Sequence, residues 1–112
     1  TAKDADLFMI SDSYSYQELM WTEALGLCER GKGGKLIDTG ETYLGGLMPV
    51  NPSGGVLAGV PILIQGLNRI AEATYQLQGK AGVNQVENAK IAVAQSNFGP
   101  AGQLQTVHVL NI

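Results

Sequence analysis

The sequence predicts an α/β domain in which a mixed sheet is flanked by helices, in the order strand, helix, strand, helix, strand, strand. Three observations carry this prediction: a short, fully apolar run near the start, two segments with apolar residues at helical spacing, and two β-rich segments near the end. Strands joined through helices are expected to run parallel with right-handed crossovers. The 112 residues, 45% hydrophobic, suffice for one domain with a modest core.

A strand and a helix are expected first. Residues 7–10 (Leu-Phe-Met-Ile) are uniformly apolar, which is typical of a strand buried on both faces. Ser15, followed by Glu18, matches a capping box and predicts that a helix begins at Ser15. Apolar residues continue at helical spacing to Gly31, a residue suited to ending a helix. Residues 31–46 are rich in glycine and charged residues and are expected to form a long surface connection.

The second half begins with a short strand at residues 47–50, which is expected to stop at the Pro- and Gly-rich turn of residues 51–55. The last two strands are predicted at residues 90–94 and 104–110. They are separated by a short Gly- and Pro-containing connection, so we expect them to pair as antiparallel neighbours.

A second helix is predicted between Pro61, which suits the first turn of a helix, and Gly79, which suits its end. Gly66 weakens this helix and is expected to allow close approach of another backbone. The expected buried stripe consists of Leu63, Leu67, Ile70, Ala71, Thr74 and Leu77.

The composition excludes several classes of partner. The net charge is −3 and Lys and Arg form no cluster, which argues against nucleic acid or an anionic membrane surface. The apolar stretches are broken by Gly or Pro and fall short of the roughly 20 residues of a membrane helix. The single cysteine, Cys28, forms no internal disulfide or structural zinc site, and no leader-like segment opens the chain, so a cytoplasmic location is expected. The start at Thr1 suggests a piece of a longer polypeptide.

Three isolated features are more consistent with structural roles. His108 lies in a predicted strand without a nearby acidic residue or cysteine, and Cys28 lies on the apolar side of a predicted helix, where it acts as a small hydrophobic residue. Residues 31–35 (Gly-Lys-Gly-Gly-Lys) resemble a phosphate loop, but they follow a helix and lack the Lys-Ser/Thr ending. We expect a solvated turn there and no metal site.

Three polar or Gly-rich loops follow the predicted strands: residues 11–14, 51–60 and 97–99. In open α/β sheets, ligands bind at the carboxyl edge of the strands, where such loops converge. The sequence therefore predicts a binding cleft at this edge.

Three segments then identify a family. They are residues 23–35 (Glu-Ala-Leu-Gly-Leu-Cys-Glu-Arg-Gly-Lys-Gly-Gly-Lys), residues 50–55 (Val-Asn-Pro-Ser-Gly-Gly) and residues 79–82 (Gly-Lys-Ala-Gly). Together they resemble the C-terminal part of the thiolase superfamily, in the branch of sterol-carrier-protein thiolases and archaeal acetyl-CoA acetyltransferases. The resemblance covers nearly the whole chain. It implies a thiolase-like C-terminal half-fold, with residues 1–112 forming one domain of a longer protein whose nucleophilic cysteine lies in the N-terminal half.

The resemblance also places the catalytic segments, and each departs from the family pattern. The Gly-His-Pro motif appears as Gly59-Val60-Pro61, so the imidazole that activates the nucleophile is replaced. The Cys-x-Gly motif appears as Asn97-Phe98-Gly99, in which an amide replaces a proton-shuttling thiol.

The family's Asn-Glu-Ala-Phe segment, which positions a water molecule, appears as residues 11–14 (Ser-Asp-Ser-Tyr). The resemblance thus implies Ser11 and Asn97 as catalytic residues. The implied substrate-binding residues are Tyr14, Val60, Phe98 and Gly99.

Three functions remain open. The first is a thiolase-type acyl-CoA acyltransferase, with a coenzyme A thioester as substrate, no covalently bound cofactor, and a cysteine supplied by the missing N-terminal half. The second is a retro-aldolase on acyl-CoA that works beside an OB-fold zinc-ribbon partner, with Tyr14 as acid or base. The third is a non-catalytic lipid- or acyl-CoA-binding subunit, in which Val60 and Phe98 make the pocket more apolar. In each case we expect a homodimer or hetero-oligomer.

Overall fold

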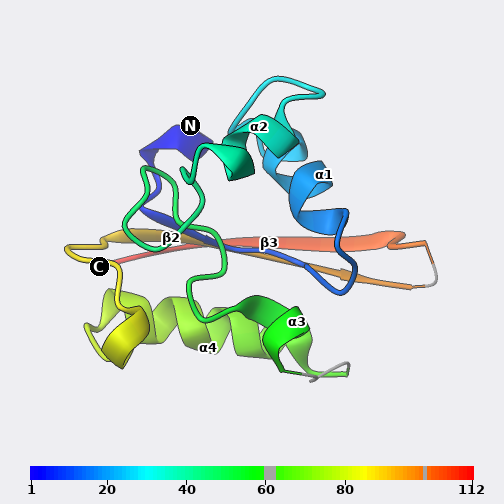
Figure 1. Ribbon diagram of the computed structural model, residues 1–112. Coiled ribbons are helices and arrows are strands. Elements are labelled where there is room, and N and C mark those ends of the chain that lie inside the picture. The colour runs from blue at the N-terminus through cyan, green and yellow to red at the C-terminus, as the bar shows by residue number, and fades with distance from the viewer. Residues whose placement is uncertain (60–62, 100) are drawn as a thin grey trace.

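A computed structural model describes residues 1–59, 63–99 and 101–112. A three-stranded mixed sheet lies in the middle, with α1 and α2 on one face and α3 and α4 on the other (Figure 1). The elements in chain order are η1 (Ala2–Asp4), β1 (Leu7–Met9), α1 (Gln17–Ala24), α2 (Gly33–Asp38), α3 (Gly55–Ala58), α4 (Gln65–Leu77), η2 (Gly82–Asn84), β2 (Ile91–Phe98) and β3 (Leu104–Asn111). This arrangement confirms the predicted mixed sheet flanked by helices.

The sheet has the strand order β1-β2-β3. β1 runs parallel to β2, and β2 pairs antiparallel with β3, with Ala94 opposite His108. The predicted antiparallel pair near the C-terminus is therefore confirmed. β2 is longer than expected and continues to Phe98.

The strand predicted at residues 47–50 is reduced to a single parallel bridge between Phe8 and Val50. Phe8 N–H donates to the Pro49 carbonyl at 2.9 Å, so the segment does lie beside β1. Asn51 N–H donates to the Phe8 carbonyl at 2.8 Å, but the next donor of the ladder, Ile10 N–H, is taken by the Asn51 side chain through Oδ1 at 2.8 Å, and Pro49 has no N–H to donate. The ladder therefore stops at this single bridge.

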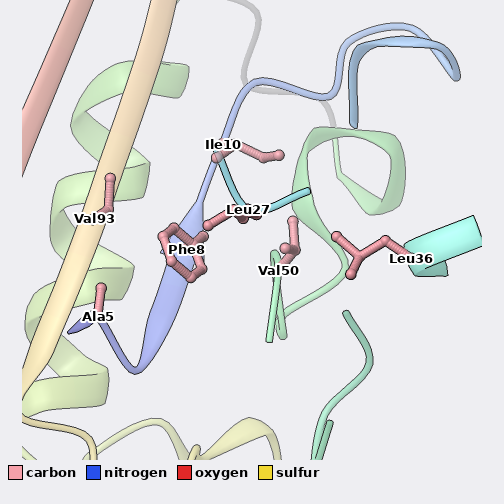
Figure 2. Packing of buried hydrophobic residues seen from close by; sticks show 7 residues of the cluster. All are labelled: Ala5, Phe8, Ile10, Leu27, Leu36, Val50 and Val93. Atoms are coloured by element: carbon pink, nitrogen blue, oxygen red, sulfur yellow. The ribbon is translucent and has the colours of Figure 1, made fainter. Parts of the chain in front are cut away.

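Two apolar clusters lie on opposite faces of the sheet because successive side chains of a strand point to opposite sides. Phe8 and Ile10 enter the cluster beneath α1 and α2, and Figure 2 shows the Phe8 ring pointing from β1 toward Leu27 and Val50. Leu7 and Met9 enter the cluster beneath α4. The prediction of a strand buried on both faces is confirmed.

The first helix differs from its prediction at both ends. α1 begins at Gln17, with Tyr16 as the N-cap and without a side-chain cap, so the capping box at Ser15 is wrong. The helix ends at Ala24 because Gly26 adopts a left-handed φ of 75°, well before Gly31. The expected connection of residues 31–46 contains the short helix α2.

α4 begins at Gln65, whereas Pro61, where its start was predicted, lies outside the described residues. Gly79 has a φ of 68° just beyond the end of α4, as predicted. Within the described residues, no helix is long and apolar enough to cross a membrane.

The predicted buried stripe of α4 is confirmed at Leu77, which is buried, and at Ile70, which packs against the cluster beneath α4, but it is wrong at its N-terminal end. Leu63 and Leu67 are exposed, whereas the buried positions are Arg69, Ala73, Gln76 and Leu77. A Cβ at Gly66 would lie 3.0 Å from Ser96 Oγ, so the close approach at this glycine comes from a side chain of β2 and not from a backbone as predicted.

Candidate functional site

A pocket of about 650 Å³ lies at the edge of the sheet where β1 and β2 both end at their carboxyl side. Its walls come from the loop after β1, the first turn of α1, α3, the start of α4 and the end of β2. The lining residues are Ser13, Tyr14, Gln17, Val56, Leu57, Leu63, Gln65, Asn97, Phe98 and Gly99. Apolar side chains and amides dominate this surface, which suits an apolar ligand with a few polar groups.

Four of the six predicted site residues meet in this pocket: Tyr14, Asn97, Phe98 and Gly99. Tyr14 and Phe98 are 61% and 71% exposed, so both rings are available to a ligand or to another part of the protein. The sheet topology explains why these residues lie close together, since β1 and β2 are parallel neighbours and the loops at their carboxyl ends converge. Val60, the fifth predicted residue, lies outside the described residues.

Ser11, the sixth predicted residue, is completely buried and does not line the pocket. Its N–H donates to Gln95 Oε1 at 2.8 Å, which ties the end of β1 to β2. Its Oγ is buried and has no hydrogen-bond partner among the described residues. The catalytic role of Ser11 stays a prediction.

Asn97 lies on β2 opposite Gln105. Its Oδ1 is buried without a partner among the described residues, whereas a Cβ at Gly102 would lie 3.2 Å from Asn97 Nδ2. The neighbouring turn therefore packs against the amide. An amide donates and accepts hydrogen bonds but does not exchange protons near neutral pH, so Asn97 is suited to hold a substrate oxygen.

Tyr14 is the one ionisable side chain among the described lining residues. Its ring is parallel to that of Tyr16, with centroids 5.7 Å apart and an interplanar angle of 2°. Its N–H donates to Gln17 Oε1 at 3.2 Å, which joins the loop to α1. Proton transfer from the described part of the pocket therefore depends on the Tyr14 hydroxyl.

Behind the pocket lies a buried ion pair that the sequence analysis missed. Arg69 Nη2 donates to Asp12 Oδ1 at 2.9 Å, and each side chain is only 5% exposed. Burial lowers the pKa of the Arg69 guanidinium, and the neighbouring Asp12 carboxylate opposes that effect. Helical spacing gave no signal for it, because Arg69 shares its face of α4 with the polar residues Gln65 and Gln76 as well as with Gly66 and Ala73.

The other isolated candidates lie elsewhere. Cys28 is half-buried against the cluster beneath α1 and α2, and burial raises the pKa of its thiol, so it is not an activated nucleophile. His108 is exposed on β3 and does not line the pocket. Gly33, in the predicted turn of residues 31–35, donates its N–H to Glu23 Oε1 at 3.1 Å. Among the described residues, three or more His, Cys, Asp or Glu side chains do not gather into a metal-binding group.

Comparisons with known proteins give a consistent result. The model of the family described as thiolase C-terminal domain-like matches residues 1–112. Sterol carrier protein 2 from Oryctolagus cuniculus is 46% identical over 100 residues, which cover 88% of this chain and 18% of that protein. Acetyl-CoA acetyltransferase from Methanothermobacter thermautotrophicus is 39% identical over 112 residues, which cover 99% of this chain and 29% of that protein.

A comparison of folds adds a solved structure. The solved structure of an Ltp2-ChsH2(DUF35) aldolase superposes with a TM-score of 0.78 and 29% sequence identity, covering 97% of this chain and 27% of that chain. This chain thus spans less than a third of the proteins it matches. The match over all 112 residues and the shared fold show that the chain belongs to the thiolase C-terminal domain-like family.

Proposed function

We propose that this chain is the C-terminal part of a thiolase-fold enzyme that acts on the carbon–carbon bonds of a coenzyme A thioester. The observation that supports it is the pocket that brings Tyr14, Asn97 and Phe98 together. Its apolar walls suit an acyl chain, and the Asn97 amide suits the thioester oxygen, where negative charge develops. The substrate is the CoA thioester itself, and we propose no covalently bound cofactor.

Retro-aldol cleavage fits the chemistry of the pocket best. In this reaction the β-hydroxyl proton of the substrate leaves, the bond between the α and β carbons breaks, and its electron pair moves onto the thioester as an enolate. A proton added at the α carbon then gives the shorter acyl-CoA, and a ketone or aldehyde departs. Tyr14 is the described group able to exchange a proton with the substrate, and Asn97 donates to the enolate oxygen.

Two further facts favour this reaction. A solved structure of the same fold is named an aldolase. Acyl transfer, in contrast, needs a base beside the nucleophile, and the resemblance implies that Val60 and Asn97 replace the family's histidine and second cysteine. By analogy with relatives of the aldolase type, we propose an OB-fold zinc-ribbon protein as the partner chain.

Thiolase-type acyl transfer is the second candidate because an acetyl-CoA acetyltransferase is 39% identical over 99% of this chain. In that reaction a cysteine from the N-terminal half of the enzyme takes the acyl group. Asn97 then holds the thioester oxygen and Ser11 holds a water molecule. A binding-only subunit is the third candidate, favoured by the apolar Phe98 and by the similarity to sterol carrier protein 2.

The exposed apolar residues of β3 support a larger assembly. Leu104 on one face of the strand and Val107 and Val109 on the other are exposed, an unusual composition for a solvent-facing edge strand. We propose that the N-terminal half of the enzyme or a second subunit covers them, as homodimer or hetero-oligomer, in the cytoplasm.

A cleavage assay on the longest natural polypeptide containing this segment separates the three candidates. A 3-hydroxyacyl-CoA branched at the β carbon and, separately, acetoacetyl-CoA with free CoA serve as substrates, and mass spectrometry resolves the products. A ketone plus a shorter acyl-CoA from the first substrate supports retro-aldol cleavage. Two acetyl-CoA molecules from the second substrate identify acyl transfer instead, and binding of both thioesters without cleavage identifies a binding subunit.

Tyr14→Phe tests the role of the phenol in the same assay. It keeps the ring and removes the proton, so we expect kcat to fall by about 10²–10⁴-fold with little change in KM. Tyr75→Phe is the matched control, since Tyr75 is an exposed tyrosine on α4 that does not line the pocket. Equal kcat in the Tyr14→Phe variant and the parent contradicts the acid–base role.

A further inference from the structure

The buried ion pair between Asp12 and Arg69 is the feature that the proposed chemistry leaves unused. Both side chains are 5% exposed, and their polar atoms meet at 2.9 Å. Burial of two charges is costly unless the geometry and the additional hydrogen bonds are good. Glu18 and Glu72 are the other charged groups that act on this pair, Glu18 through Asp12 and Glu72 through Arg69.

The pair joins three segments that form walls of the pocket. Asp12 Oδ1 also accepts the N–H of Val56 in α3 at 2.9 Å. Arg69 Nη1 donates to the Gln65 carbonyl at 3.0 Å and to Gln65 Oε1 at 3.3 Å. Gln65 Oε1 in turn accepts from Ser13 Oγ at 3.2 Å, so the loop after β1, α3 and α4 form one network.

The network reaches the pocket without entering it. Val56, Gln65 and Ser13 line the pocket, whereas Asp12 and Arg69 do not. Tyr14 is two residues from Asp12 in the same loop, and its own hydrogen bond to Gln17 Oε1 is long, at 3.2 Å. The Tyr14 carbonyl also accepts the N–H of Gln17 at 2.9 Å, which holds Tyr14 to α1, whereas the Asp12 carboxylate anchors the loop to α3 and α4.

We propose that Asp12 and Arg69 are positioning residues, a charge pair that fixes the loop of residues 11–14 against α3 and α4 and so sets Tyr14 opposite Asn97. The effect on kcat rests on the proposed function, whereas the fixing of the loop against α3 and α4 does not. Asp12 touches no substrate and transfers no proton.

The test compares Asp12→Asn with the parent in the longest natural polypeptide. Asparagine keeps an oxygen for the Val56 N–H but removes the charge. A loosened loop misplaces the phenol, so we expect kcat to fall by about 100-fold, with a smaller change in KM. Asp38→Asn, an exposed aspartate at the end of α2, is the matched control and should leave kcat unchanged.

The dependence of kcat on pH separates positioning from acid–base chemistry. The residual activity of Asp12→Asn should keep the shape of the parent's pH profile, because the titrating group is elsewhere. Loss of the acidic limb in this variant overturns the inference, as it makes Asp12 a proton-transfer group. A kcat within twofold of the parent also overturns it.

Two further variants, Arg69→Gln and the double variant Asp12→Asn/Arg69→Gln, keep the inference testable if Asp12→Asn is too unstable for kinetic assays. Arg69→Gln leaves a buried carboxylate unpaired and should lower the melting temperature most. The double variant leaves no buried charge, so its melting temperature should exceed that of Arg69→Gln. Equal melting temperatures in these two variants show that the charges are not coupled and contradict the inference.

Amide hydrogen exchange gives a readout that is independent of catalysis. In Asp12→Asn, amides of residues 11–14 and 55–58 should exchange faster, while those of β2 should not change. This result supports the positioning role even if neither thioester is cleaved, in which case the proposed reaction alone fails. Unchanged exchange in residues 11–14 refutes the positioning role and leaves the proposed reaction intact.

Discussion

Gly55, the first residue of α3, sits directly against the Asp12 carboxylate. Its φ is 63°, and a Cβ at this position would lie 1.9 Å from Asp12 Oδ2. Any side chain here must both adopt a left-handed backbone and displace the carboxylate. This residue explains why the Asn-Pro-Ser-Gly-Gly turn requires a glycine at its end.

We therefore expect Gly55→Ala to destabilise the protein by at least about 2 kcal/mol. Gly34→Ala is the matched control, because Gly34 lies in α2 with an ordinary φ and with open space where a Cβ would lie. It should be neutral or stabilising, since alanine favours helices. Urea unfolding of both variants checks the pair, and equal stabilities contradict the packing described.

Glu18, on α1, gives a prediction about pH. Burial raises the pKa of its carboxyl, the Asp12 charge adds to this effect, and Thr42 opposes it. A folded-state pKa above the unfolded value means that stability is fully present at low pH and is lost as pH rises through the folded pKa. At neutral pH the ionised Glu18 therefore reduces stability.

Glu18→Gln removes that charge at nearly constant volume. We expect the variant to be more stable than the parent at pH 7, by about 0.5 kcal/mol for a half-buried group. The difference should shrink as the pH falls from 7 toward 4.5, the ordinary value for this carboxyl, and should vanish below that value. Thermal unfolding between pH 4 and pH 7 measures it, and a variant that is less stable at pH 7 rules out the proposed cause.

At the scale of elements, the three strands of the sheet were predictable, whereas the strand expected at residues 47–50 and the boundaries of α1 were not. The apolar run of residues 7–10 predicted β1 correctly because a strand buried on both faces has no competing pattern. The start of α1 failed, since Ser15 and Glu18 have the spacing of a capping box but the chain turns into the helix only at Gln17. Gly26 ends that helix early through a left-handed conformation that Gly31 also adopts.

α4 was placed along the chain with only part of its buried face correct, since Leu77 is buried as predicted. The sequence pattern favoured the large apolar residues Leu63 and Leu67, yet Leu67 is 67% exposed and two polar residues, Arg69 and Gln76, are buried instead. Arg69 is buried because Asp12, 57 residues away, pairs with it. Such a long-range contact leaves no local signal, so neither the rotation of α4 nor the ion pair could be predicted from spacing alone.

Two alanines of α4 distinguish the two rotations. Ala73 is 0% exposed in the structure, whereas Ala71 belongs to the predicted stripe and is only half-buried. We expect Ala73→Leu to cost about 1–3 kcal/mol through overpacking and Ala71→Leu to be nearly neutral. Melting temperatures of the two variants test this expectation. A lower melting temperature for Ala71→Leu than for Ala73→Leu supports the rotation of α4 predicted from the sequence.

At the scale of the whole molecule, the candidate site follows from topology. The sequence placed Tyr14, Asn97, Phe98 and Gly99 after strands that were expected to share an edge, and the parallel pairing of β1 with β2 brings these four residues to one pocket. The anchoring of this pocket was missed. It depends on how α3 and α4 close behind the loop, which only the packed structure determines.

The exposed apolar residues of β3 predict self-association of the 112 residues made alone. Val107 and Val109 lie on the strand at the open edge of the sheet, where backbone groups and apolar side chains are both available. We expect Val107→Lys/Val109→Lys to shift sedimentation toward the monomer. Gln78→Lys/Val83→Lys adds the same charge at exposed positions outside the sheet and should not. Equal sedimentation of both double variants shows that β3 is not the associating edge.

The most direct measurement is a crystal structure of the longest natural polypeptide with an amide analogue of a 3-hydroxyacyl-CoA, in which nitrogen replaces the thioester sulfur. The proposed function predicts the acyl chain in the pocket beside Phe98, with its carbonyl oxygen about 3 Å from Asn97 Nδ2 and its hydroxyl facing Tyr14. An analogue seated elsewhere, for example in the groove lined by Lys3, Lys32 and Lys35, contradicts the assignment of this pocket as the acyl-CoA site.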